Sequence, residues 1–248
     1  VYPYILPKPL RQLNVIEGIR REFLAYRAGI SGADEQALLS PDFHYLTSPQ
    51  ALAFNLFFPF RLTSPGAPLL QSSLGLEPDR VVASSFEKLL DAEEQLTFSF
   101  WLELESGKRV GFINLFAEET FGSILKPNPG AVNRFRDVYS KQLQGKVPDM
   151  CLRQEVFFDH YQIMRAVSHL DLDRGDHLFL IFPAANDQLV RHESEIRIIT
   201  SGALGESMTI LHLEDFVQRI LDASASSDPF FASHYRAFKE KYFLAVPS

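Results

Sequence analysis

The chain has 248 residues, of which 46% are hydrophobic and 22% are charged. It has enough apolar side chains to fold, which excludes global disorder. The 24 Lys and Arg against 31 Asp and Glu give a net charge of −7, which argues against a protein that binds nucleic acid by a broad basic surface.

The proline-rich residues 1–9 predict an extended arm and not a signal peptide, since a basic stretch followed by an apolar core is missing. Apolar residues then recur at helical spacing to about residue 28: Leu10, Leu13, Ile16, Ile19 and Phe23. Ser48 or Thr47 is positioned to cap a second helix, which ends before Pro59. Residues 61–79 are rich in proline and predict a loop.

Residues 96–104 alternate between apolar and polar side chains, which predicts a half-buried strand. One face of that strand carries the apolar residues: Leu96, Phe98, Phe100, Leu102 and Leu104. Ser106-Gly107 is typical of a turn, and residues 110–116 are apolar on nearly both faces. We therefore expect an antiparallel hairpin over 96–104 and 110–116.

Helical stripes over 132–143 and 157–167 follow, then an apolar strand over 177–182 that ends at Pro183. A short strand at 209–213 precedes helices around 216–221 and 231–242. This order predicts an α/β or α+β fold with a mixed central sheet and flanking helices. Since no Gly-, Pro- or Ser-rich linker separates two cores, we expect one domain over residues 10–248.

The longest apolar run, residues 51–60, is far shorter than the ~20 residues that cross a bilayer. The single cysteine, Cys151, excludes an intrachain disulfide and thiolate zinc clusters, and we expect it to be buried and inert. These features predict a cytoplasmic protein with no membrane contact.

The order of a hairpin, a helix and a further strand resembles the core of the PD-(D/E)XK nucleases. Short segments are similar to a bacterial restriction-endonuclease-like family of that superfamily: Leu96-Thr-Phe-Ser-Phe100, Ser106-Gly-Lys-Arg-Val-Gly-Phe112 and Glu118-Glu-Thr-Phe-Gly122. Residues 48–59 and Tyr161-Gln-Ile-Met-Arg165 also match. The resemblance spans residues 47 to about 183 and implies a restriction-endonuclease-like fold.

The same resemblance places Ser99, Ile113 and Leu115 where these nucleases have a metal-binding Asp, a metal-binding Glu and a Lys that positions water. Serine is a poor lone ligand for Mg²⁺, and Ile and Leu are none. From the two-residue period of a strand we expect the three side chains to share one face of the hairpin, as a vestigial site without a metal cofactor.

Four further residues are candidate remnants of an active site. Glu87 matches an upstream acid of the superfamily, and Glu118 matches the acid after the lysine. Gln162 and Arg165 lie one helical turn apart on a helix that borders the active site in the family, where Arg can contact phosphate. Each also has a simpler interpretation: Glu87 as a solvated acid, Glu118 as a loop residue, and Gln162 with Arg165 as a surface pair.

Other polar groups have no metal-ligand spacing. The acidic stretch 171–177 lacks the twelve-residue pattern of a calcium loop and predicts a turn. His160 and His169 are nine residues apart on one predicted helix, whereas a metal pair needs three or four. Arg134, Arg136 and Lys141, on another predicted helix, are the candidates for a local basic patch.

Three functions remain open from the sequence. The first is a catalytically degenerate nuclease-fold protein that acts as a binding or scaffolding module. The second is an active nuclease that uses displaced acids (Glu87, Glu103 and Glu118) with Mg²⁺ or Mn²⁺. The third is a protein-interaction module unrelated to nucleic acid, and the acidic charge favours a protein partner.

Overall fold

The computed structural model describes residues 5–30, 39–91, 96–224 and 228–243. The chain divides into two compact units, which we call the terminal unit, residues 1–81 with 212–248, and the sheet unit, residues 82–211. The sequence predicts one domain over residues 10–248, and this division into two compact units does not test that prediction.

The terminal unit is helical. Its elements are a 3-10 helix Lys8–Asn14, α1 Glu17–Ile30, α2 Pro49–Phe57, a 3-10 helix Phe58–Arg61, α3 Gly66–Leu74, α9 Leu213–Ser224 and α10 Pro229–Tyr242. The predicted cap of α2 is confirmed, because the Ser48 hydroxyl accepts a hydrogen bond from the Ala51 amide at 3.3 Å. Phe57 is the last residue of α2, as the sequence predicts.

Two expectations for this unit need correction. The predicted arm is shorter than nine residues, because the first 3-10 helix begins at Lys8 with Pro9 in its first turn, where the fixed φ of proline fits. The predicted loop over 61–79 contains α3, which tolerates Pro68 in its first turn for the same reason. Gly75 ends α3 with φ +70°, a left-handed conformation that glycine adopts at low cost.

Aromatic residues from both ends of the chain form the core of the terminal unit. The ring of Phe60 lies 5.5 Å from that of Phe231 and 5.9 Å from that of Tyr235, both on α10. The ring of Phe57 lies 6.3 Å from that of Phe216 on α9. The aromatic cluster at residues 54–60 is therefore part of the core.

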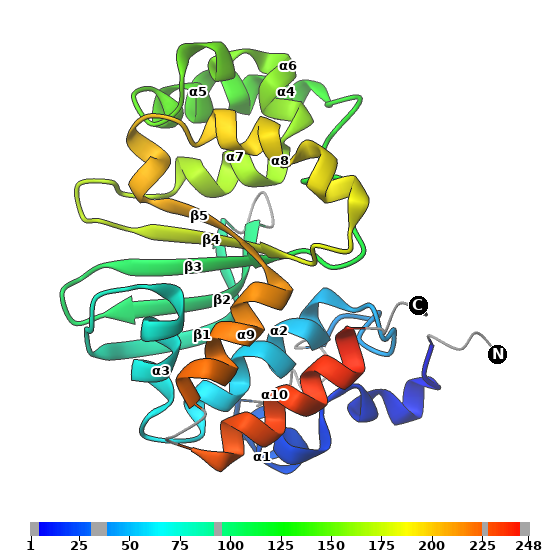
Figure 1. The fold of residues 1–248 in the computed structure, drawn as a ribbon. Helices are drawn as coiled ribbons and strands as arrows, with labels where there is room; N and C mark the ends of the chain where they lie inside the picture. The colour runs from blue at the N-terminus through cyan, green and yellow to red at the C-terminus, as the bar shows by residue number, and fades with distance from the viewer. Residues whose placement is uncertain (1–4, 31–38, 92–95, 225–227, 244–248) are drawn as a thin grey trace. The chain divides into compact units, whose positions relative to one another are not determined.

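The sheet unit holds five strands in the order β1-β2-β3-β4-β5 (Figure 1). The strands are β1 Val81–Asp91, β2 Leu96–Leu104, β3 Arg109–Asn114, β4 His177–Phe182 and β5 Met208–His212. The helices are α4 Pro129–Arg134, a π-helix Phe135–Tyr139, α5 Ser140–Leu143, a 3-10 helix Asp149–Leu152, α6 Gln154–Asp159, α7 Tyr161–Ser168, α8 Asp187–Ile199 and a 3-10 helix Ala203–Glu206. β2 and β3 are antiparallel and β3 and β4 parallel, so the predicted mixed sheet is confirmed.

The predicted hairpin is confirmed, with a register that runs from Phe100 opposite Phe112 to Glu103 opposite Arg109. In its turn, the Leu104 amide donates to the Lys108 carbonyl at 2.9 Å. Gly107 has φ +88°, which explains the turn signal in the sequence.

The predicted alternation of β2 is wrong at its centre, because the strand changes phase between Phe98 and Trp101. A Cβ atom on Gly111 would lie 2.7 Å from the Phe98 ring and 3.1 Å from the Trp101 ring, so both rings cover the same face of β3. At the change of phase, the Ser99 hydroxyl accepts a hydrogen bond from the Asn114 amide at 3.1 Å. A side-chain oxygen thus replaces a ladder carbonyl, as at a β-bulge.

One face of the sheet packs against the helices α4–α8, which gather on one side of the strands in Figure 1. This helix face carries Phe98 and Trp101 of β2 and Ile113 of β3. The opposite face carries a row of aromatic rings, in which Phe112 lies 5.7 Å from Phe100 and 5.4 Å from Phe179. The sheet is thus apolar on both faces.

β1 was not predicted from the sequence, and its backbone explains why. Glu87 in its middle has φ +49°, and it is the one non-glycine residue with positive φ in the described part of the chain. A residue in this region interrupts the two-residue alternation of a strand, which was the signal used. Because a Cβ atom disfavours the left-handed region by about 1 kcal/mol, β1 holds local strain at Glu87.

Replacing Glu87 with Gly should raise the free energy of unfolding by about 0.5–1 kcal/mol, measured by urea denaturation at pH 8. Glu87→Gln removes the same charge but keeps the Cβ atom, so it separates the electrostatic contribution from the backbone one. Lys88→Gly, at a strand residue without positive φ, should instead lower stability by about 1 kcal/mol, including the loss of the Lys88 contact with Glu103. Equal destabilisation by the two glycine variants would contradict strain at Glu87.

Candidate functional site

Two of the three positions of the predicted vestigial site lie in the apolar core. Ile113 and Leu115 are 1% and 2% exposed and both belong to the core on the helix face. Ser99 lies beside them on β2, with its hydroxyl bonded to the Asn114 amide. No carboxylate stands at any of the three positions, so these side chains do not fit a divalent ion.

Asn114, between Ile113 and Leu115, was missed by the sequence argument. Its side chain is 3% exposed, and neither its Oδ1 nor its Nδ2 has a hydrogen-bond partner among the described residues. A buried amide without partners costs about 1–3 kcal/mol. Asn114 thus adds a buried neutral amide to β3, on the strand face opposite Ile113.

The acids that could replace the missing ligands do not come together. Glu87 lies on β1 at the edge of the sheet, and β2 separates that strand from β3. Glu103 lies opposite Arg109 in the register of β2 and β3, at the start of β3. Glu118 follows the other end of β3 and accepts a hydrogen bond from the Phe116 amide. Across the described residues, no group of three His, Cys, Asp or Glu side chains is arranged to hold a metal ion.

Glu87 and Glu103 differ in their surroundings. Nearby protein atoms desolvate the carboxylate of Glu87 and raise its pKa to about 7, although the residue is exposed at its surface. The carboxylate of Glu103 accepts a hydrogen bond from the Trp101 indole at 3.2 Å and lies 3.6 Å from the Lys88 ammonium. Glu87 is thus a desolvated carboxylate on β1, whereas the carboxylate of Glu103 on β2 is bonded to neighbouring side chains.

Gln162 and Arg165 lie on α7, as predicted, but they face different surroundings. A Cβ atom on Gly122 would lie 2.5 Å from the Gln162 Cβ, so the loop after β3 packs closely on the start of α7. Gly122 also has φ +79°, and both constraints favour glycine there. Arg165 is buried, with its guanidinium carbon 4.7 Å from the centre of the Tyr161 ring. It is a packed residue and not part of a surface pair.

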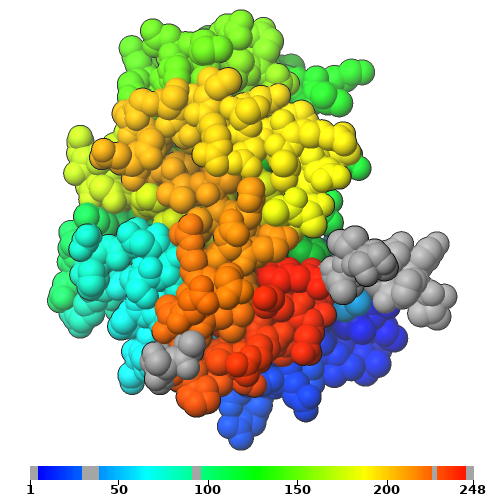
Figure 2. Space-filling model, viewed as in Figure 1, coloured from blue at the N-terminus to red at the C-terminus, as the bar shows by residue number. Residues whose placement is uncertain are grey.

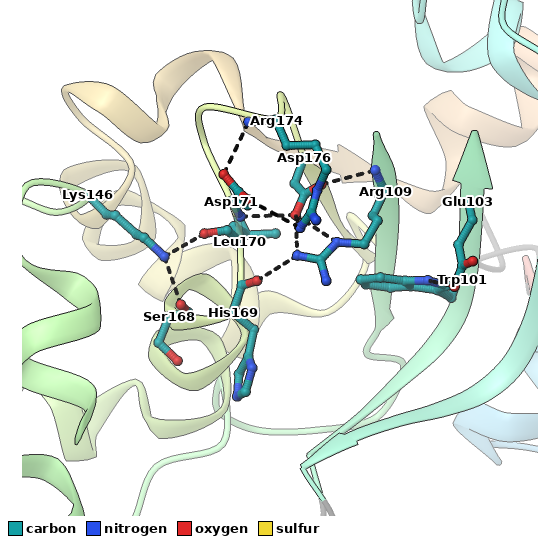
Figure 3. Close-up of polar contacts among 10 residues, drawn as sticks. All are labelled: Trp101, Glu103, Arg109, Lys146, Ser168, His169, Leu170, Asp171, Arg174 and Asp176. Carbon is teal, nitrogen blue, oxygen red and sulfur yellow. Dashed lines mark hydrogen bonds and ion pairs between the residues drawn. The ribbon is translucent and has the colours of Figure 1, made fainter. Parts of the chain in front are cut away.

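The acidic stretch 171–177 forms a turn, as predicted, and its most buried carboxylate is used inside the protein (Figure 3). Asp176 is 0% exposed at its side chain and accepts from the Arg174 guanidinium at 2.8 Å. It also accepts from the Arg109 side chain at 2.9 Å and from the Arg109 amide at 3.0 Å. The Asp171 amide donates a further hydrogen bond at 3.0 Å.

These bonds decide the charge state of Asp176. Burial opposes ionisation, but the hydrogen bonds from Arg174 and Arg109 outweigh it and lower the pKa to about 2. Arg109 also reaches the His169 carbonyl at 3.1 Å and lies over the Trp101 ring (Figure 3). This cluster ties the turn before β4 to the start of β3 and uses the carboxylate of Asp176 for internal bonds.

The predicted basic residues lie on the helical run from α4 to α5. Arg136 and Lys141 are exposed, and Arg134 is partly buried with its guanidinium carbon 6.0 Å from the centre of the Tyr139 ring. Cys151 is buried as predicted, and burial raises the pKa of its thiol. In the described residues, no helix is long and apolar enough to cross a membrane.

A pocket of about 270 Å³ lies in the sheet unit, where the loop after β3 meets α8, the helix that follows β4. β3 and β4 are parallel, and in α/β sheets ligands bind where the connections leave the carboxyl ends of such strands. The loop is held there because the Phe121 ring packs 5.6 Å from Phe182 and Asn186 donates to the Glu118 carbonyl at 2.9 Å. Eight residues line the pocket: Thr120, Phe121, Ser123, Leu125, Asp159, His160, His192 and Glu195.

Two imidazoles face one carboxylate in this pocket. Glu195 Oε2 lies 3.4 Å from His160 Nε2 and 3.2 Å from His192 Nδ1. The sequence predicted one helix over 157–167, but the chain breaks at His160, which has φ −123° and ψ 36° between α6 and α7. This break lets His160 meet α8. Burial lowers the pKa of His160, although the nearby Glu195 carboxylate partly offsets it.

A family model described as REase-ARP, "Restriction Endonuclease associating with ARP", matches residues 2–243. The chain belongs to this family. The resemblance to a restriction-endonuclease-like family is thus confirmed, and the match extends beyond residues 47–183 at both ends. No curated protein and no solved structure matches the sequence.

In this REase-ARP chain the sequence did not reveal that the residues of the pocket come together, and His160 was considered only as a metal ligand. His192 and Glu195 stand three residues apart on α8, a spacing that brings side chains together and could have been noticed. His160 and Asp159 carried no such signal, because their place depends on a break between α6 and α7 and on packing against a distant helix. The mixed sheet with flanking helices agrees with the restriction-endonuclease-like fold of the family.

Proposed function

We propose that this chain is a nuclease-fold protein that does not cleave nucleic acid and that binds a protein partner instead. The observation that carries the proposal is the burial of Ile113 and Leu115 in the apolar core, at positions where the resembling nucleases have a metal-binding carboxylate and a lysine. An apolar site of this kind cannot hold or activate a hydrolytic metal ion.

Three further features support a protein partner. The net charge of −7 disfavours contact with phosphates. The acids Glu87, Glu103 and Glu118, which could have formed a displaced metal site, lie apart in the sheet unit. The family description names association with ARP, and we take such an association as the role of this chain. A bacterial, cytoplasmic setting is part of the proposal, and a single free cysteine fits a reducing compartment.

Purified protein should not cleave plasmid DNA, single-stranded DNA or RNA in the presence of Mg²⁺ or Mn²⁺ beyond its level in EDTA. Its Tm should also be unchanged by either metal, because a bound ion would stabilise the folded state. Gel analysis of the products and thermal denaturation are the measurements. Metal-dependent cleavage that is lost in Glu118→Gln but kept in Glu119→Gln would overturn the proposal in favour of an active nuclease.

A further inference from the structure

We propose that the pocket between the loop after β3 and α8 binds an arginine side chain of a protein partner. The inference rests on the proposed function in one respect, because it takes the ligand to be a protein. It adds the place of contact and the chemistry of the recognised group.

The charge of the pocket calls for a cationic ligand. Asp159 and Glu195 contribute two carboxylates, and the lining includes no Lys or Arg among the described residues. Glu195 is 48% exposed at its side chain and Asp159 is also exposed, so both can meet a group that enters from solvent. α8, yellow in Figure 2, lies at the surface of the sheet unit. A phosphate group would be repelled by the same carboxylates.

The hydrogen-bonding groups of the pocket are mainly acceptors. A carboxylate only accepts hydrogen bonds, so the nitrogens of His160 and His192 that face Glu195 carry their protons. The other nitrogen of an imidazole is an acceptor whenever that ring is neutral, and His160 Nδ1 is buried without a partner among the described residues. The hydroxyls of Thr120 and Ser123, 3.3 Å apart, can accept as well. A guanidinium, with five donors in a planar fork, matches several acceptors better than an ammonium does.

The size and the apolar wall of the pocket fit one long side chain. Its volume of about 270 Å³ lies just below the roughly 300–1,000 Å³ of typical small-molecule sites. Leu125 stands at the pocket with 90% of its surface exposed, which is unusual for a leucine. The methylene groups of an arginine would cover Leu125 while the guanidinium enters the polar part.

The direct test uses the peptide Ac-Gly-Arg-Gly-NH₂ and its neutral citrulline counterpart, which has nearly the same shape. Carbon-proton NMR spectra of the intact chain resolve its seven histidines, and His160 and His192 are assigned with single His→Gln variants. We expect saturable shifts of these two signals with a Kd in the millimolar range, and at least tenfold weaker binding of the citrulline peptide. Equal binding of both peptides would overturn the inference, because charge would then play no part.

Two variants on α8, Glu195→Gln and Glu193→Gln, test whether binding depends on the carboxylate in the pocket. Glu195→Gln should weaken binding of the arginine peptide at least fivefold, and Asp159→Asn should do so where the first variant is unstable. Glu193→Gln is the matched control, since Glu193 pairs with Arg197 outside the pocket lining, and its Kd should stay within twofold. If Glu195→Gln leaves the Kd unchanged, or if micromolar Zn²⁺ shifts both histidines and displaces the peptide, the arginine site is wrong. Metal-dependent cleavage would overturn the proposed function independently of these results.

Discussion

Asp176→Asn should lower the free energy of unfolding by about 3 kcal/mol, because it leaves two arginines without the buried carboxylate that pairs with them. Asn keeps the shape, but the Arg109 and Asp171 amides donate to different oxygens of Asp176 and Asn has only one, so the loss includes one of these hydrogen bonds as well as the charge. For a chain of this size the change corresponds to a Tm lower by roughly 6–12 °C. Urea denaturation at pH 7 and thermal scans measure both quantities.

The same carboxylate should make stability depend on pH in the acid range. Its pKa falls from an ordinary 3.8 to about 2 in the folded protein. A lowered folded pKa contributes stability that is complete above the ordinary value and is lost as the pH falls toward 2. The contribution at neutral pH is roughly 2 kcal/mol. The difference between the parent and Asp176→Asn should therefore shrink as the pH falls from 4 to 2.

Asp173→Asn is the control for this prediction, because Asp173 is an exposed acid in the same turn. It should change the free energy of unfolding by less than about 0.5 kcal/mol at any pH. If the two Asn variants have the same stability at pH 7, the cluster around Asp176 does not hold the turn to the start of β3. A constant difference from pH 4 to pH 2 would contradict the lowered pKa.

Much of the fold could be predicted because its signals are local. The hairpin follows from the alternation before Ser106-Gly107 and the apolar run after it, and β4 follows from five apolar residues between His177 and Pro183. The errors occur where one residue interrupts the two-residue alternation of its strand. Glu87 with positive φ hides β1, and the change of phase near Ser99 moves Phe98 and Phe100 to opposite faces. Neither departure has a sequence signature of its own.

The functional residues were harder to predict because their partners are distant in the chain. The acid turn was recognised, but Arg109, which pairs with Asp176, lies 67 residues earlier on another strand. His160 is paired with Glu195 only because α6 and α7 are separate helices, and the stripe over 157–167 continues through the break. By contrast, the prediction that the metal-binding triad is lost depends on residue identity alone and needs no distance information.

Restoring the nuclease residues with Ser99→Asp, Ile113→Glu and Leu115→Lys should destabilise the protein by several kcal/mol. Ile113 and Leu115 are buried among apolar side chains, so Glu and Lys would lose their hydration there unless they pair with each other or with an ion. Total stability is roughly 5–15 kcal/mol, and the variant should therefore be only marginally stable without metal. Mg²⁺ or Mn²⁺ at 100 times its Kd should restore about 2.7 kcal/mol, seen as a rise in Tm of roughly 5–11 °C.

The matched control is Ser99→Asn, Ile113→Gln and Leu115→Lys, which has the same side-chain volumes but no carboxylates. It should be destabilised without metal and should gain nothing from Mg²⁺, because neutral amides are weak ligands compared with carboxylates. The parent should not respond either, since Ser99 offers one hydroxyl that already accepts from the Asn114 amide. If the parent and all folded variants respond alike to metal, Ser99, Ile113 and Leu115 are not the counterparts of the nuclease triad. A response confined to the carboxylate variant would mean instead that the backbone still holds the geometry of a metal site whose ligands have been lost.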